Sequence, residues 1–243
     1  MQRLFPGGRA TSIAEALAEL KLAQRAPAER PYVVTNFAVT IDGHATVDGL
    51  SGKIGSGLDT ELLMGLRERA DAVLVGAGTI RAERYGRLLP DPERRSKRER
   101  DGLPAEPLAV IVSAALDLPW EIGMFTDGGP VLIVTSAEGD PPETEVSVQV
   151  DRHRESVDLA AALGSLRAEH GVRLLLCEGG PRLHGALHSA SLVDELFVTV
   201  GPLLGGGAGP RMLEGKLATP VSLELLGLLE ARGELFARYR VLS

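Results

Sequence analysis

The chain has 243 residues, 44% of them hydrophobic and 24% charged, so it can bury a sizeable core and does not have the composition of a disordered protein. Its net charge of −7 and its 4% aromatic content argue against a nucleic-acid partner. Cys177 is the only cysteine, which excludes an intrachain disulfide and a thiolate metal cluster. The N-terminus lacks an apolar signal region, and no stretch reaches the ~18 apolar residues of a membrane span, so we expect a cytoplasmic protein without a metal site.

The apolar pattern predicts an N-terminal helix at residues 11–26, with Thr11 or Ser12 as its N-cap. Further along, short apolar or β-branched runs bounded by turn residues predict strands, and segments with helical spacing predict helices. The mixed-charge run 93–101 is predicted to be a solvent-facing loop or short helix. The expected strands are 32–40, 44–47, 72–75, 108–112, 130–135, 146–150, 172–176, 196–200 and 235–241, and the expected helices are 59–69, 157–169, 181–188 and one after residue 79.

This alternation predicts an α/β fold with a mostly parallel central sheet flanked by helices. Residues 196–200 and 235–241 are expected to close the sheet as antiparallel edge strands. We expect residues 1–30 to form an N-terminal extension with a helix, and residues 31–243 to form a single domain. Apolar edge strands are exposed to pairing with another chain, so the pattern also predicts a homodimer.

Two glycine turns follow buried strands. In Val75-Gly76-Ala77-Gly78-Thr79 the chain passes from a strand into a helix, whose first backbone N–H groups favour a phosphate. A tight turn that needs glycine for packing explains this segment equally well. The second turn is Glu178-Gly179-Gly180-Pro181, again at the carboxyl end of a strand, where ligands bind in open α/β sheets. Two glycine turns at the carboxyl ends of buried strands favour a single cofactor cleft that uses both turns.

Three polar residues accompany these turns. Glu178 ends a buried strand, and a carboxylate there is costly unless it meets a ligand or an arginine partner. Asp42 follows the strand 32–40 in an Asp-Gly pair, which by itself is usually a turn. Arg67, on the helix before the first glycine turn, is either a salt-bridging residue or a ligand contact. The glycine-rich segment 201–209 either touches a phosphate or forms a flexible hairpin.

Together these segments resemble the pyrimidine reductase family of riboflavin biosynthesis, whose pattern has these motifs in the same order. The resemblance extends over about residues 32–239. Its motifs are Thr40-Ile41-Asp42-Gly43, Val75-Gly76-Ala77-Gly78-Thr79, Glu178-Gly179-Gly180, Val193-Asp194-Glu195-Leu196 and Gly201-Pro202-Leu203-Leu204-Gly205. The resemblance implies a dihydrofolate-reductase-like fold, NADPH as hydride donor, a phosphorylated ribosylaminopyrimidine as substrate, and a homodimer.

The resemblance also implies roles for individual residues. Asp42 is expected beside the reacting carbon as the catalytic group. Substrate contacts are expected from Ser51, Arg67 and Glu178, with Arg67 suited to the substrate phosphate. Cofactor contacts are expected from Ala38, Gly76, Gly78, Thr79, Glu83, Ser113, Gly179, Gly180, Pro181, Arg182 and Leu183.

Two departures from the family pattern keep alternatives open. The family often has Asp-Asp-Pro after the Gly-Thr turn, whereas this chain reads Ala82-Glu83-Arg84-Tyr85-Gly86, which puts the substrate in doubt. The zinc pattern of the partner deaminase domain is absent, so we expect a separate reductase. A dihydrofolate or pteridine reductase is the nearest alternative, and a non-catalytic nucleotide-binding protein is the other.

Overall fold

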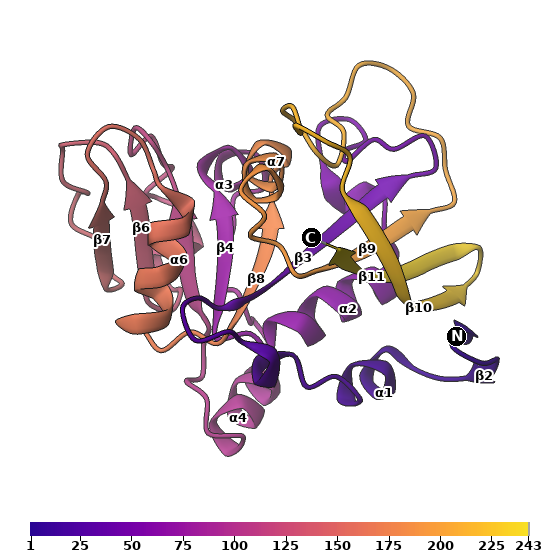
Figure 1. The fold of residues 1–243 in the computed structure, drawn as a ribbon. Coiled ribbons are helices and arrows are strands. Elements are labelled where there is room, and N and C mark those ends of the chain that lie inside the picture. The colour runs from indigo at the N-terminus through magenta and orange to yellow at the C-terminus, as the bar shows by residue number, and fades with distance from the viewer. Residues whose placement is uncertain (243) are drawn as a thin grey trace. The chain divides into compact units, whose positions relative to one another are not determined.

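The computed structural model describes residues 1–242, which divide into two compact units. The first unit comprises Met1–Leu22, Val33–Leu66 and the chain from Cys177 onward. The second comprises Ala23–Tyr32 and Arg67–Leu176. No helix among the described residues is long and apolar enough to cross a membrane. Figure 1 labels most of the helices and strands of both units.

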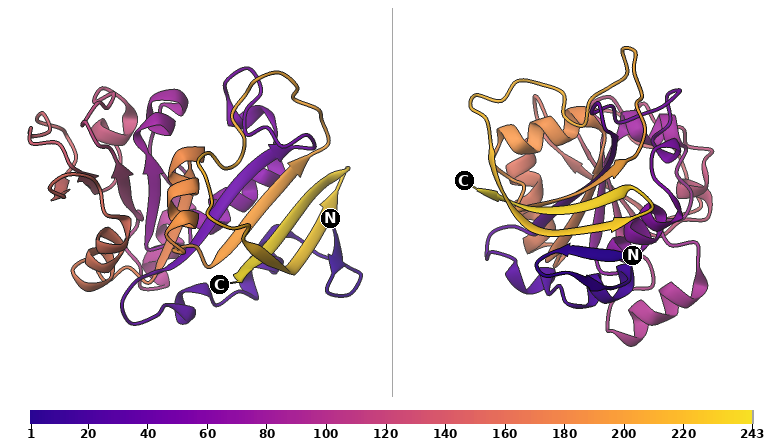
Figure 2. Two further views of the ribbon diagram at one scale, coloured as in Figure 1. Left: turned by 45° about the horizontal axis from the view of Figure 1, so that its top comes forward. Right: turned by 90° about the vertical axis from the view of Figure 1, so that its right-hand side faces the viewer.

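The first unit is built on a mixed sheet. Its centre is the parallel pair β3 and β9, and four antiparallel pairings follow in the order β9, β11, β10, β1 and β2. Figure 2 shows β10 and β11 as a long twisted hairpin. The strands are β1 (Gln2–Phe5), β2 (Arg9–Ala10), β3 (Tyr32–Thr40), β9 (Glu195–Gly201), β10 (Ser222–Ala231) and β11 (Glu234–Leu242), and the helices are α1 (Ile13–Ala18), η2 (Ser51–Lys53), α2 (Gly57–Arg67) and α7 (Pro181–Ser189).

The second unit has a parallel sheet of four consecutive strands, β4, β5, β6 and β7. The middle strands are apolar and buried along most of their length, as expected of parallel strands covered on both faces. The strands are β4 (Ala72–Gly76), β5 (Leu108–Val112), β6 (Val131–Thr135) and β7 (Val148–Arg152), and the helices are α3 (Ala77–Glu83), α4 (Pro92–Arg100), α5 (Gly123–Thr126) and α6 (Leu159–Ala168). The elements η1 (Leu22–Arg25) and β8 (Leu174–Gly179) cross the division between the units. The strand β3 and the helix α2 each have one residue, Tyr32 and Arg67, in the second unit.

The α/β class with its largely parallel sheet is confirmed, and so are most of the predicted elements. The N-terminal helix is shorter than predicted because α1 ends at Ala18. Ser12 caps it and forms a capping box with Glu15. Residues 44–47 form only isolated bridges at His44 and Val47 rather than a strand. The division into an extension and a single domain stays a prediction.

The prediction that residues 196–200 and 235–241 lie at the sheet edge is wrong, although their antiparallel pairing is confirmed. The strand β9 is paired with β3 and β11, and β11 is paired with β9 and β10. The chain continues the sheet beyond β11 with β10 and β1, which the sequence analysis did not predict. In β10 a register shift between Leu225 and Gly227 breaks the alternation of apolar and polar residues, so its leucines do not follow a simple strand pattern.

The prediction that the run 93–101 faces solvent is wrong for one residue. Most of α4 is exposed or half-buried, but Arg98 is fully buried. Its guanidinium donates hydrogen bonds to the carbonyl oxygens of Arg67 (3.1 Å), Glu68 (3.0 Å), Ala70 (2.7 Å) and Pro104 (2.8 Å). Arg98 therefore binds the carbonyl groups at the end of α2, which have no partner within the helix.

We expect Arg98→Met to lower the free energy of unfolding by about 3 kcal/mol or more, because it leaves several buried carbonyl groups without a donor. Urea denaturation followed by circular dichroism measures the change. Arg100→Met on the exposed side of α4 is the matched control and should change stability little. Equal stability of the two variants would contradict the role given to Arg98.

Candidate active site

The carboxylate of Asp42 is held by a set of donors in the first unit. Thr40, the last residue of β3, donates its hydroxyl to Asp42 Oδ1. The backbone N–H groups of Gly205 and Gly206 donate to Oδ1 and Oδ2 at 2.9 and 2.8 Å. His44 Nδ1 lies 3.1 Å from Oδ2. These contacts tie the turn after β3 to the glycine-rich segment after β9.

These donors also set the charge of Asp42. The Thr40 hydroxyl, followed by the amides of Gly205 and Gly206, holds the pKa of the Asp42 carboxyl well below its usual range. Asp42 is therefore an anion at neutral pH and has no proton to donate. An acid beside a reacting carbon can either orient the reactant or donate a proton to it. The contacts of Asp42 favour the orienting role. The segment 201–209, considered above as a flexible hairpin, supplies two of the donors.

The second glycine turn requires glycine at position 179 for two reasons. Gly179 has a φ of +95°, which side chains rarely adopt. A Cβ atom there would also lie 2.7 Å from Cζ of Phe37, which is too close. Gly180 is the N-cap of α7 and no side chain caps this helix, while Pro181 occupies its first turn. The first backbone N–H groups of α7 thus have no capping side chain.

Two buried histidines lie behind this turn, and the sequence analysis missed them. The ring of His184 stacks on Phe37 with 4.5 Å between centroids. Its Nδ1 is 3.0 Å from the carbonyl oxygen of Met212, and its Nε2 is 2.9 Å from Nε2 of His188. A carbonyl only accepts, so Nδ1 of His184 carries the proton and Nε2 accepts from His188. Burial lowers the pKa of His184 to about 4, so the pair is neutral at pH 7.

The other predicted residues of the first unit lie on β3, η2, β8 and α7. Ala38 is the one residue of β3 that is only half-buried. Ser51 opens η2 and is exposed. Glu178 is half-buried near the end of β8, directly before the Gly179 turn. Arg182 is exposed and Leu183 is buried in the first turns of α7.

In the second unit the predicted residues lie at the ends of β4 and β5. Gly76 ends β4 and is the N-cap of α3, which no side chain caps. Gly78 is exposed, and a Cβ atom there would meet nothing within 4 Å. Thr79 is half-buried in the same helix, and Glu83 is its last residue. Ser113 follows β5, is buried, and donates its backbone N–H to Val134.

Arg67 is engaged within the second unit. It is 7% exposed and donates to the carbonyl oxygen of Leu88 at 2.9 Å. Its guanidinium lies over the ring of Tyr85, 5.3 Å from the centroid. These contacts support residues 85–88, which overlap the segment 82–86 that departs from the family pattern. Arg67 thus has a structural role, and its contact with a substrate phosphate stays a prediction.

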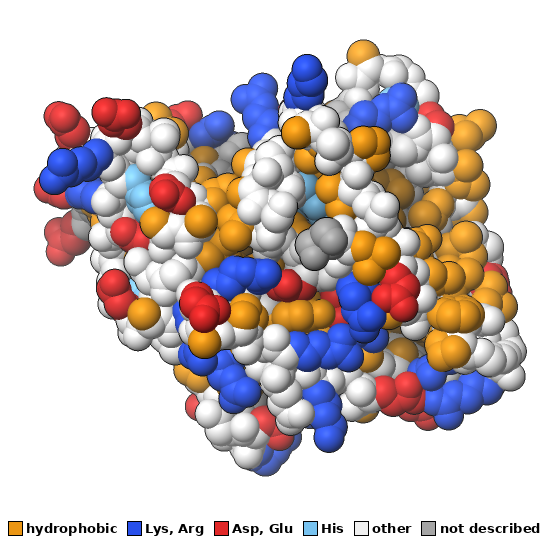
Figure 3. All heavy atoms as spheres, viewed as in Figure 1, with side chains coloured by type: hydrophobic (Ala, Val, Ile, Leu, Met, Phe, Trp, Pro, Cys, Tyr) orange, Lys and Arg blue, Asp and Glu red, His pale blue; other side chains and the backbone are white. Residues whose placement is uncertain are grey.

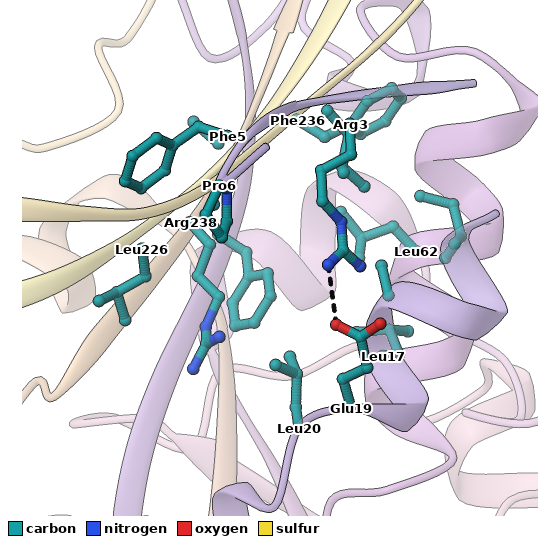
Figure 4. A pocket seen from close by; sticks show the side chains of 16 residues that line it. Arg3, Phe5, Pro6, Leu17, Glu19, Leu20, Leu62, Leu226, Phe236 and Arg238 are labelled. Carbon is teal, nitrogen blue, oxygen red and sulfur yellow. Dashed lines mark hydrogen bonds and ion pairs between the residues drawn. The ribbon is translucent and has the colours of Figure 1, made fainter. Parts of the chain in front are cut away.

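A separate cavity of about 170 Å³ lies within the first unit, and none of the residues predicted for the site lines it (Figure 4). Its walls are mostly apolar side chains of α1, β1, β10 and β11, among them Leu17, Leu226 and Phe236. Arg3 and Glu19 form an ion pair of 2.9 Å on its lining. Arg238, also on the lining, pairs with the buried Glu195 at 2.6 and 2.9 Å.

Comparison with known proteins identifies the family. Residues 31–234 match the model of the RibD C-terminal domain. The chain is 31% identical over 193 residues to the 2,5-diamino-6-ribosylamino-4(3H)-pyrimidinone 5′-phosphate reductase of Archaeoglobus fulgidus, covering 77% of this chain and 88% of that protein. It is 31% identical over 226 residues to the protein of the same name from Methanothermobacter thermautotrophicus, covering 87% and 99%.

A solved structure is similar in fold over nearly the whole chain. It is a pyrimidine reductase-like protein from Corynebacterium diphtheriae, with a TM-score of 0.78, 23% identity, and coverage of 96% of this chain and 100% of that one. The chain belongs to the RibD C-terminal domain family. It is an oxidoreductase of the riboflavin-biosynthesis reductase type, which confirms the resemblance drawn from the motifs.

We expect Asp42→Asn to lower the thermal transition at pH 7, because an amide cannot replace a carboxylate that accepts from Thr40, Gly205 and Gly206. The folded-state pKa of Asp42 is depressed, so its contribution is present above the unfolded value of about 3.9 and is lost as the pH falls. The difference between wild type and variant should therefore shrink below about pH 4.

Thermal transitions of both proteins between pH 3 and 7 measure this effect. The matched control is Asp48→Asn, because Asp48 is an exposed acid that pairs with Lys53 on the surface. If the difference in thermal transition between wild type and Asp42→Asn stays constant from pH 3 to 7, the charge of Asp42 does not stabilise the fold.

Proposed function

We propose that this protein reduces a ribosylaminopyrimidine 5′-phosphate to the ribityl compound in riboflavin biosynthesis, with NADPH as the hydride donor. The observation that carries the proposal is the match, over most of both chains, to two reductases named for a phosphorylated ribosylaminopyrimidinone. We further propose that it works in the cytoplasm.

The residues proposed for the cofactor fit a dinucleotide. The helices α3 and α7 both begin at a glycine without a capping side chain, which leaves backbone N–H groups for phosphate oxygens. When bound, NADPH supplies the hydride that reduces the sugar carbon. In the second unit we assign binding to Gly76, Gly78, Thr79, Glu83 and Ser113, and in the first to Ala38, Gly179, Gly180, Pro181, Arg182 and Leu183.

The residues proposed for the substrate are Ser51, Arg67 and Glu178, with Asp42 at the catalytic position. Asp42 stays ionised and fixes the segment 205–206, so in this proposal it orients the reacting centre and does not protonate it. Arg67 reaches the phosphate only if its contact with the Leu88 carbonyl is shared or exchanged. A planar guanidinium has five N–H donors, which is enough for both.

The test of the function is an NADPH-oxidation assay on purified protein with three substrates. These are the 2-amino-4-oxo and the 2,4-dioxo forms of the ribosylaminopyrimidine phosphate, and dihydrofolate. Oxidation dependent on either pyrimidine, with formation of the ribityl product by mass spectrometry, supports the proposal. Oxidation with dihydrofolate alone would replace it with the pteridine alternative, and oxidation with none of the three would contradict it.

We expect the enzyme to prefer NADPH to NADH. No acid ends β5, and arginines that suit a 2′-phosphate follow the first glycine turn. Arg87 is held by Glu106 and Asp127, whereas Arg81 and Arg84 are more exposed and pair with the exposed Asp117 and Glu121. Arg81 and Arg84 are therefore the better candidates.

Arg81→Gln and Arg84→Gln together should weaken NADPH binding by roughly tenfold to a hundredfold and leave NADH binding unchanged. Fluorescence titration with each cofactor measures both constants. Arg100→Gln, on the exposed side of α4, serves as the control. Equal affinities of the wild type for NADPH and NADH would argue against the preference itself.

We propose a homodimer whose interface differs from the one expected from sequence, which was the edge formed by residues 196–200 and 235–241. The strand β9 is internal, but β1, β10 and β11 expose Leu4, Phe5, Leu223 and Leu242 to between 42% and 47%. Hydrophobic side chains lie at the surface over the β10–β11 hairpin, on the right of Figure 3.

Light scattering should give a dimer mass at micromolar concentration. Leu223→Glu should give a monomer, while Leu204→Glu, in an exposed loop, should not.

A further inference from the structure

The apolar cavity of the first unit has one face of the mixed sheet as a wall (Figure 4). Paired residues on neighbouring strands point to the same face of a sheet. Arg3 of β1 is paired with Leu229 of β10, which is paired with Phe236 of β11. Arg238, two residues after Phe236, lies on the same face and is paired with Phe197 of β9. All five residues line the cavity, so four neighbouring strands contribute to this wall.

Two strand irregularities occur in this wall. The pairing of β1 with β10 shifts register between Arg3 and Phe5, and the pairing of β10 with β11 shifts register between Leu225 and Gly227. Bulges of this kind are frequent beside functional sites. Gly227 lines the cavity, and a Cβ atom there would meet only Phe5 O at 3.9 Å and Arg238 Cβ at 4.0 Å. The strand therefore leaves open a space that a side chain at position 227 could occupy.

The N-terminal segment and α2 supply further lining residues. The helix α1, the two residues after it and α2 contribute Ile13, Ala16, Leu17, Glu19, Leu20 and Leu62. The part of the lining that comes from residues 3–20 precedes the region 31–234 that matches the family model. None of the residues that we assign to the substrate or the cofactor lines the cavity. A ligand in this cavity would therefore be an additional ligand of the protein.

The charged side chains of the lining and their ion-pair partners have one positive charge in excess. Arg3 donates from Nη1 to Glu19 at 2.9 Å, and Arg9 donates to the same carboxylate. Arg238 is matched by the buried Glu195 through two hydrogen bonds. Two acids thus balance three arginines. Of the five guanidinium N–H donors of Arg3, residues 1–242 provide an acceptor only for one on Nη1.

We propose that this cavity binds a small monocarboxylic acid whose apolar body is about the size of one aromatic ring. Apolar cavities of about 150 Å³ take a molecule of the size of benzene, and this cavity measures about 170 Å³. The ring would contact the apolar walls, and the carboxylate would accept from the remaining N–H groups of Arg3. A guanidinium presents its donors in the geometry that a carboxylate accepts bidentately.

The charge and burial of the site favour a monoanion. The Arg3 side chain is only 11% exposed, so a contact with it is better shielded from water than an ion pair on the surface. One carboxylate matches the single excess charge of the arginines. A phosphate dianion would bring a second negative charge into a largely apolar cavity, where no further cation on the lining balances it.

The experiment titrates 4-fluorobenzoate and the neutral 4-fluorobenzamide into the whole chain and follows binding by ¹⁹F NMR. Wild type should bind the acid with a dissociation constant of about 1 mM or lower, and the amide roughly tenfold more weakly, because the amide lacks the charge that Arg3 matches. Arg3→Gln should weaken binding of the acid by about tenfold and leave binding of the amide unchanged. Arg240→Gln is the matched control, because Arg240 pairs with the exposed Glu224 and does not line the cavity.

Gly227→Val places a side chain in the cavity and should abolish binding of both compounds. Its thermal transition should equal or exceed that of wild type, because valine suits a strand better than glycine and the added atoms meet no close neighbour at Cβ. This variant leaves every charged group of the site in place, so it tests the cavity independently of Arg3.

Four outcomes would overturn the inference. Absence of binding of the acid to wild type is the first, and equal binding to wild type and Gly227→Val, which places the compound elsewhere, is the second. Displacement of the acid by NADPH would assign it to the proposed cofactor site. Binding to Leu223→Glu but not to wild type would show that a second copy of the chain fills the cavity. None of these measurements requires turnover, so each outcome leaves the proposed function standing.

Discussion

The Asp42 carboxylate is the contact on which the chain beyond the ends of β3 and β9 depends. The strands β3 and β9 are parallel neighbours with Thr40 opposite Gly201, so the segments that leave them emerge at the same edge. Beyond that edge the backbones pair only through the isolated bridge of His44 with Arg211 and single hydrogen bonds, such as Ile41 N–H to Leu203 O. Asp42 adds side-chain contacts to these, because each of its oxygens accepts a backbone N–H from the segment that follows β9. Arg211 then returns a hydrogen bond to the Asp42 carbonyl oxygen.

The same returning segment also supports the second glycine turn. Met212, the neighbour of Arg211, accepts a hydrogen bond from His184 of α7, and His184 stacks on the Phe37 ring that lies against Gly179. Residues 205–212 therefore contact the end of β3 on one side and α7 on the other. A substitution within residues 205–212 is therefore expected to affect both the Asp42 turn and the Gly179 turn, although the segment belongs to neither turn.

The sequence predicted the parts of this protein that depend on local pattern. Buried apolar strands followed by glycine turns, such as β4 with Gly76, are visible in a window of a few residues. Arg98 was missed because the carbonyl groups that justify its burial come from residues 67–70 and 104, which no local pattern connects. The partners of Asp42 were missed for the same reason, since Gly205 lies 163 residues away. The strand β10 was missed because its bulge disturbs the period of two.

Three acids of the first unit differ in the partners of their carboxylates, and the contrast indicates which of them serves the fold. Glu195 is fully buried and is matched by both guanidinium nitrogens of Arg238. Asp42 is matched by a hydroxyl and two backbone amides. In both cases the folded chain itself supplies the partners, so the acid completes the structure. Asp59 has a weaker match, because burial and the like charge of Glu234 raise its pKa and only the Thr199 hydroxyl lowers it. A carboxylate held by several donors stabilises the contacts around it more than one with a single donor does, so the fold depends more on Glu195 and Asp42 than on Asp59.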